Sequence, residues 1–148
     1  MIKELTMDFK YKDITEKVIG AAMKVHTTPG NGFQEIIYQR ALALQMQADN
    51  LSFIRECNMP VLYLEQQIGE RRVDFFVENK ICVELKAITN LESVHFAQAR
   101  NYLEAFNIEI GLLINFGAVS LQFKRLANPK FNPAIINHPQ NPNYLPKS

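Results

Sequence analysis

The sequence predicts an α/β (α+β) fold in which a mixed central sheet is flanked by helices, and three observations lead to this prediction. Apolar residues recur at helical spacing between residues 14 and 48. Short strand-like runs then follow one another over residues 53–87. A further helical segment leads into the continuous apolar run 110–116, which is typical of a buried central strand. This order of elements is that of a sheet covered by helices.

Two helices are predicted ahead of the first strand. The first is indicated by apolar residues at helical spacing, which are Ile14, Val18, Ala21, Ala22 and Val25. Asp13 and Glu16 would cap its start, and residues 27–32, which contain a proline and two glycines, would end it. The second helix is expected over residues 33–48.

The strand-like runs are separated by turn signals. They cover residues 53–57, 61–65, 72–78, 81–87 and 110–116, with a further edge strand over residues 121–126. Pro60 separates the first two runs, which is consistent with a meander. A third helix is expected over residues 91–106, between the fourth and fifth strands.

The composition is ordinary and counts against one class of protein. The chain has 148 residues, which is the length of one domain with a sizeable core. A formal net charge of +1 gives no global basic signal, so a tight non-specific nucleic-acid binder is disfavoured. Any affinity for nucleic acid would have to come from a local patch.

The chain carries no targeting or membrane signal. No apolar run approaches the ~18 residues that a membrane span needs, and residues 1–5 lack a signal-peptide core. Cys57 and Cys82 have no metal-like spacing and are expected to be reduced thiols of a cytoplasmic protein without a membrane partner. Residues 128–148 hold five of the seven prolines, so a Pro/Asn-rich tail is expected after a domain of residues 1–127.

The segment from Val73 to Lys86 reads as a β-hairpin that carries charges where a core needs none. Val73, Phe75 and Val77 alternate on its first strand, and Ile81, Val83 and Leu85 alternate on its second. A two-residue loop would set Phe75 opposite Glu84 and bury a charge. A three-residue loop over residues 79–81 instead pairs Phe75 with Leu85 and sets Asp74 opposite Lys86, and this is the register that we predict.

In that register Asp74, Glu84 and Lys86 share the face opposite the apolar residues. Glu84 and Lys86 would lie roughly 6.6 Å apart at a rise of ~3.3 Å per residue. Converging carboxylates suit Mg²⁺, and a lysine beside them can orient an attacking water or neutralise charge on a phosphate. The alternative is an ordinary half-exposed hairpin with an Asp74–Lys86 ion pair.

The Asp, followed by Glu-x-Lys on the next strand, resembles the PD-(D/E)XK nuclease superfamily. Residues 32–38 (GFQEIIY), 94–103 (VHFAQARNYL) and 111–117 (GLLINFG) make the chain similar to the GxxExxY family of that superfamily, from about residue 14 to 126. The resemblance implies a restriction-endonuclease-like core. It also implies that Asp74 and Glu84 bind metal, that Lys86 assists the water, and that Glu35 completes the site. Val73 stands where the superfamily's name has a proline.

Further site residues are expected on two helices. Glu35 occupies a favoured N-terminal helix position, and with the resemblance we expect it to face the site as a third metal ligand. Tyr38, one turn later, is a candidate substrate contact, although aromatic packing with the hydroxyl at the rim is the more common role for such a residue. On the third helix three polar residues form one stripe: His95, Gln98 and Tyr102. Gln98 is expected to support catalysis, and His95 and Tyr102 to contact substrate.

Basic residues near the hairpin complete the set of candidates. Those expected to bind a phosphate backbone are Arg71, Arg72, Lys86 and Arg100, with a solvated charged surface as the alternative. The resulting hypothesis is an endonuclease or exonuclease that uses Mg²⁺, with Mn²⁺ as a substitute, to hydrolyse DNA in preference to RNA. A non-catalytic interaction or nucleic-acid-binding module is the alternative, and a homo-oligomer is left open.

Overall fold

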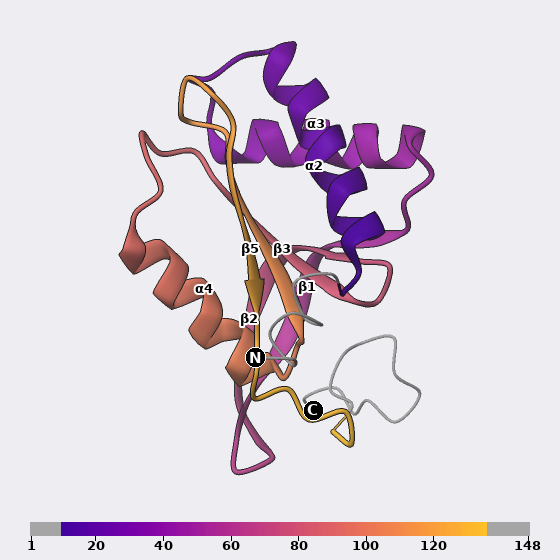
Figure 1. Ribbon diagram of the computed structural model, residues 1–148, viewed down its shortest axis with the longest axis vertical. Helices are drawn as coiled ribbons and strands as arrows, with labels where there is room; N and C mark the ends of the chain where they lie inside the picture. The colour runs from indigo at the N-terminus through magenta and orange to yellow at the C-terminus, as the bar shows by residue number, and fades with distance from the viewer. Residues whose placement is uncertain (1–9, 136–148) are drawn as a thin grey trace.

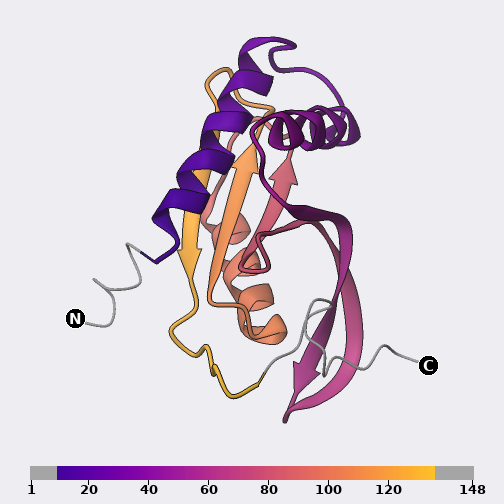
Figure 2. The same ribbon diagram turned by 90° about the vertical axis from the view of Figure 1, so that its right-hand side faces the viewer.

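The computed structural model describes residues 10–135 and contains a five-stranded sheet between two helical layers (Figure 1). The strands lie in the order β1-β2-β3-β4-β5. Helices α2 and α3 cover one face of the sheet and α4 covers the other, as the two perpendicular views show (Figures 1 and 2). The predicted mixed sheet flanked by helices is therefore confirmed.

The three helices form where apolar residues recur at helical spacing. They are α2 (Lys12–Thr27), α3 (Glu35–Ala48) and α4 (Ser93–Phe106). The predicted stripe of α2 is buried as expected, and it packs with Tyr38 and Leu42 of α3 in the first core cluster. Leu103 and Phe106 of α4 belong to a second cluster on the other face of the sheet.

Within the described residues the structure has five strands where six were predicted, and its second strand begins at Gln66 rather than at residue 72. They are β1 (Phe53–Tyr63), β2 (Gln66–Val77), β3 (Ile81–Lys86), β4 (Ile110–Asn115) and β5 (Gln122–Ala127). The two runs predicted on either side of Pro60 are a single strand, because β1 is an edge strand and tolerates a proline. Leu64 and Glu65, with φ of 49° and 63°, form the turn into β2.

The β3-α4-β4 segment is a crossover between parallel strands. Because β3 and β4 run in the same direction (Figure 2), their carboxyl ends meet at one edge, where Lys86 pairs with Asn115. The other three neighbouring pairs of strands are antiparallel.

The predicted register of the β2–β3 hairpin is wrong by two residues. Phe75 lies opposite Val83, and Val77 lies opposite Ile81. The three loop residues are 78–80 rather than 79–81, because Glu78 and Asn79 both adopt left-handed φ values, of 53° and 57°. A shift of two preserves the side of the sheet that each β3 residue faces, but it removes Asp74 from its predicted place opposite Lys86.

The predicted face of Val73 is also wrong. It was predicted to share a face with Phe75, but Phe75 lies in the first cluster and Val73 lies in the second, against α4. The alternation of β2 therefore changes at Asp74, where the ladder with β3 has ended and where Glu56 of β1 has a left-handed φ of 52°.

Three other predictions concern membrane spans, the two cysteines and the C-terminal tail. Within residues 10–135, no helix is long and apolar enough to cross a membrane. Cys57 and Cys82 are free and buried, and burial raises the pKa of Cys57 to about 11. Most of the predicted tail and all of residues 1–5 lie outside the described residues. Asn128, at the start of that tail, is buried and donates to the backbone oxygens of Leu103 and Ile108.

Candidate functional site

Asp74 lies at the point where β2 separates from β3. Here its carboxylate takes the place of the backbone hydrogen bonds between the two strands, because Oδ2 accepts a hydrogen bond of 2.8 Å from the backbone N–H of Leu85. Oδ1 accepts a second one, of 2.7 Å, from Nε2 of Gln39. Asp74 is thus held by β3 on one side and by α3 on the other, at the boundary between the two faces of the sheet.

Gln39 is a functional candidate that the sequence reasoning missed. Its side chain is only 5% exposed, and it lies one helical turn after Glu35, on the same side of α3. Its Oε1 is buried and has no hydrogen-bond partner within the part of the chain that the structure describes. The spacing of four residues from Glu35 was the signal that could have found it.

The carboxyl group of Glu84 is mostly buried, and its pKa is raised. Its side chain is 19% exposed. Burial is the main cause that raises the pKa of Glu84 to about 7, the charge of Arg71 opposes the rise, and the charge of Asp74 together with a hydrogen bond between the two carboxyl groups adds to it. The carboxyl groups of Asp74 and Glu84 therefore converge.

Arg71, one of the residues predicted to bind a phosphate backbone, meets this carboxyl group. Nη1 of Arg71 donates to Oε1 of Glu84, and its guanidinium lies 4.1 Å from the ring centroid of Tyr102. Arg72 is the next residue along the strand, so its side chain leaves on the opposite side and approaches Glu56 at 3.9 Å. The structure does not bring Arg72 to Glu84, and its predicted contact with substrate stays a prediction.

The polar side chains predicted to share one side of α4 do lie over the end of β3. A small hollow between them is lined by Arg71, Glu84, Lys86, His95, Gln98, Ala99, Tyr102 and Leu113. Gln98 and Tyr102 are thereby brought beside Glu84 and Lys86. His95 also caps its own helix, since Nδ1 accepts a hydrogen bond of 2.9 Å from the backbone N–H of Glu92.

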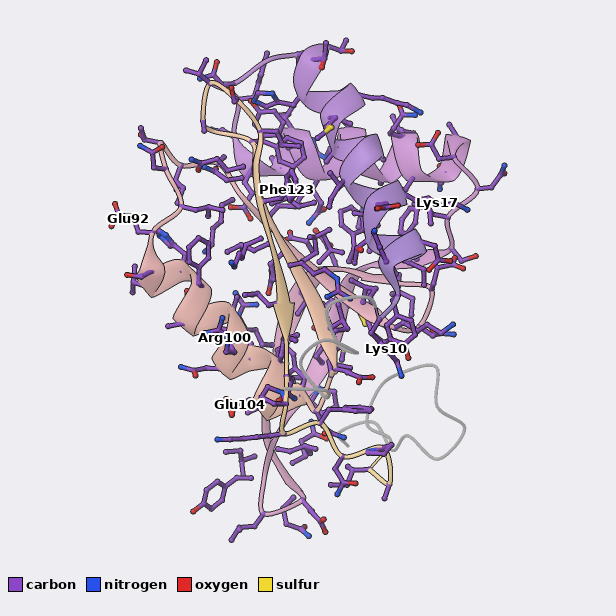
Figure 3. All side chains as sticks on the ribbon, viewed as in Figure 1. Lys10, Lys17, Glu92, Arg100, Glu104 and Phe123 are labelled. Atoms are coloured by element: carbon purple, nitrogen blue, oxygen red, sulfur yellow. The ribbon has the colours of Figure 1, made fainter. Side chains whose placement is uncertain are left out.

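Arg100 lies elsewhere on the same helix. Its side chain is exposed, and Figure 3 shows it between Glu92 and Glu104 along α4. It does not line the hollow.

Glu35 is near the site but does not complete a three-carboxylate set. Partial burial, and next the charge of Asp74, raise the pKa of Glu35, whereas Lys86 and Arg71 lower it. Yet residues 10–135 contain no group of three His, Cys, Asp or Glu side chains placed to hold a metal ion. The predicted ligand set of Asp74, Glu84 and Glu35 is therefore not assembled in this structure, and Glu35 stays partly exposed in the first turn of α3.

Tyr38 was predicted to contact substrate, and this is wrong. The residue is fully buried, and its ring stacks on that of Phe116 at 4.7 Å between centroids. Its hydroxyl donates to the backbone oxygen of Gly30 and accepts from the backbone N–H of Phe33. Tyr38 closes the loop between α2 and α3 instead.

Asn115 is a second residue that the sequence reasoning missed. It is fully buried next to Lys86 on the neighbouring strand. Its Oδ1 accepts from the N–H groups of Ile88 and Gly117, and its Nδ2 donates to the oxygen of Ile88 and to Oε1 of Gln122. The amide thus ties the chain just after Lys86 to the end of β4 and to the start of β5.

Comparison with known proteins supplies the family. The sequence profile of the PD-(D/E)XK nuclease superfamily matches residues 12–126. The chain belongs to this superfamily. A solved crystal structure, that of a protein called SSO0001, is similar to this PD-(D/E)XK chain at 18% identity with a TM-score of 0.47. The match covers 63% of this chain and 49%, or about half, of the other. A comparison with curated proteins gives no match.

PD-(D/E)XK nucleases generally use divalent metal ions, and the donors present here fit such an ion. Two carboxylates, Asp74 and Glu84, converge from neighbouring strands, and both belong to the hard oxygen donors that Mg²⁺ prefers. One or two protein carboxylates are the usual number, because water and substrate phosphates fill the other positions.

Proposed function

We propose that this chain is a nuclease of the GxxExxY branch that hydrolyses phosphodiester bonds with the help of Mg²⁺, for which Mn²⁺ can substitute. The observation that carries the proposal is the convergence of Asp74 and Glu84 at the point where β2 separates from β3, with Lys86 two residues further along β3. DNA is proposed as the substrate ahead of RNA by analogy with the superfamily.

Each residue has a role that follows from its position. Asp74 and Glu84 would hold the cation, and Gln39 with the N–H of Leu85 would keep the Asp74 carboxylate in one orientation. When bound, the cation would lower the pKa of a water molecule and offset the charge of the phosphate. Lys86 would orient the attacking water or stabilise charge on the phosphate oxygens. Gln98 and His95, on the other wall of the hollow, would position the substrate.

The low net charge of the chain bears on how a nucleic acid would be bound. The net charge is +1, so binding would depend on the few cations at the site rather than on the whole surface. The free, buried state of both cysteines supports a proposed cytoplasmic location, where thiols stay reduced.

The test is a cleavage assay on single-stranded, duplex and branched DNA and on RNA, with Mg²⁺, Mn²⁺ or a chelator. Asp74→Asn and Glu84→Gln should each abolish cleavage without unfolding the protein. Glu70→Gln, which changes an exposed carboxylate on the same strand as Asp74, is the matched control and should cleave like the wild type. Equal cleavage by Asp74→Asn and wild type would place the activity elsewhere.

One observation favours the alternative, a non-catalytic nucleic-acid-binding module. In the structure Arg71 already neutralises Glu84, as it would in a site that no longer binds metal. A module of this kind would bind nucleic acid with equal strength in Mg²⁺ and in chelator, and would cut none of the four substrates.

A further inference from the structure

Arg71 occupies one of the two carboxylate oxygens of Glu84, a proposed ligand of the cation. Its guanidinium donates to Oε1 of Glu84. Neither side chain is free in solvent, because they are only 32% and 19% exposed. The Coulomb attraction between two charges is greater when they are partly removed from water, so Arg71 competes with other cations for the same carboxylate.

Tyr102 holds the guanidinium from its other side. The distance of 4.1 Å between the guanidinium carbon and the ring centroid is that of a cation–π contact. The ring of Tyr102 is itself stacked on Phe106, which is 1% exposed, at 5.6 Å between centroids. Arg71 is therefore fixed between a carboxylate of β3 and an aromatic platform of α4.

The charges around the site show what the arginine does to metal binding. When Glu84 is ionised, Asp74 and Glu84 supply two negative charges and Lys86 and Arg71 supply two positive ones, so these four groups are neutral together. Without Arg71 the same group would carry one negative charge and would attract a divalent cation more strongly. A guanidinium, however, also binds phosphate oxygens well, through paired hydrogen bonds.

We propose that Arg71 is a guard of the metal site, which occupies Glu84 until a phosphate of the nucleic acid draws the guanidinium away. The inference rests on the proposed function, because it takes Glu84 as a metal ligand and a phosphodiester as the substrate. Since coupling between two ligands is reciprocal, nucleic acid would tighten metal binding and metal would tighten nucleic-acid binding. Metal binding in the absence of nucleic acid would be kept weak.

The test is calorimetric titration of the full chain with Mn²⁺ alone. Arg71→Gln should bind Mn²⁺ roughly tenfold more tightly than the wild type, within the range usual for coupled sites. Arg72→Gln is the matched control, because it removes the same charge one residue away, on the side facing Glu56. It should bind Mn²⁺ like the wild type.

The second measurement repeats the titration with a phosphorothioate DNA duplex, which keeps the phosphate charges and resists cleavage. The duplex should tighten Mn²⁺ binding to the wild type and should have little effect on Arg71→Gln. Tyr102→Leu removes the aromatic platform but leaves the arginine charge in place. It should also bind Mn²⁺ more tightly than the wild type, which keeps the proposal testable if Arg71→Gln does not fold.

The outcomes separate this inference from the proposed function. The proposed role of Arg71 is overturned if Arg71→Gln binds Mn²⁺ as the wild type does or more weakly. It is also overturned if Arg72→Gln raises the Mn²⁺ affinity as much as Arg71→Gln does. Both results count even if the wild type cleaves nucleic acid. Tighter Mn²⁺ binding by Arg71→Gln alone, together with no cleavage by any of the proteins, supports the guard and overturns the nuclease proposal.

Discussion

Gln39 of α3 donates a hydrogen bond of 2.7 Å to Oδ1 of Asp74 on β2 and so connects the helical layer directly to the candidate metal site. The two residues are far apart in the sequence, and only the packing of α3 on the sheet brings them together. The backbone N–H of Leu85 holds the other oxygen of the same carboxylate.

Gln39→Met should therefore weaken metal binding while leaving the fold intact. Loss of a residue that orients a metal ligand typically lowers affinity about 10- to 100-fold. Mn²⁺ titration by calorimetry measures this. Gln45→Met is the matched control, because it removes a similar hydrogen bond, 3.1 Å to Asp49, on the same helix away from the site. Equal Mn²⁺ affinity in the two variants would show that Gln39 does not position Asp74.

The raised pKa of Glu84 predicts how stability depends on pH. The pKa rises from 4.5 to about 7 on folding, mainly through burial, so folding favours the protonated form. The stabilising effect is fully present below about pH 4.5 and is lost as the pH rises through about 7. Urea unfolding of the metal-free protein at pH 5 and pH 8 measures the loss, which should be smaller in Glu84→Gln. A variant with the same pH dependence as the wild type would assign the effect to other groups.

Lys86→Met separates catalysis from metal binding. The methionine keeps an apolar stem against its neighbours and removes a positive charge next to the metal site. Cleavage should fall by at least about 10²-fold, as expected for losing a group that stabilises charge in the reaction. Mn²⁺ affinity should be retained or increased. Lys17→Met, on the exposed side of α2 (Figure 3), is the control that should change neither quantity.

The turn after β4 predicts a clear difference between two glycines. A Cβ on Gly117 would lie 2.3 Å from the backbone oxygen of Ile88, in the loop that Asn115 ties to the end of β4. Gly117→Ala should therefore destabilise the protein by about 1–3 kcal/mol, the usual effect of overpacking. Gly20→Ala meets nothing within 4 Å inside α2 and should instead stabilise it by roughly 0.5–1 kcal/mol. Thermal unfolding of both variants measures the contrast.

Strand periodicity explains how much of the site could be predicted. Because side chains alternate along a strand, the apolar residues of β3 identified the face on which Glu84 and Lys86 lie. The register could not be predicted, since it depends on Glu78, which adopts a left-handed φ of 53° although glutamate is not typical there. The face of Val73 was predicted wrongly for a related reason, because the hydrophobic pattern gives no sign of the irregularity at Asp74.

The remaining errors arise from contacts between distant segments. The roles of Gln39 and Arg71 depend on how α3 and α4 pack on the sheet, and no local pattern contains that information. Tyr38 was placed on the correct helix, but its burial against Phe116 depends on a strand that follows much later in the sequence.

The most direct test of the proposed metal site is a crystal structure of the protein soaked in Mn²⁺. The anomalous signal should show one ion bound by carboxylate oxygens of both Asp74 and Glu84, at the roughly 2.1 Å typical of small hard divalent cations, with Arg71 displaced from Glu84. An active protein that shows no Mn²⁺ between these two carboxylates, or Mn²⁺ bound at another position, would contradict the metal site and the nuclease mechanism built on it.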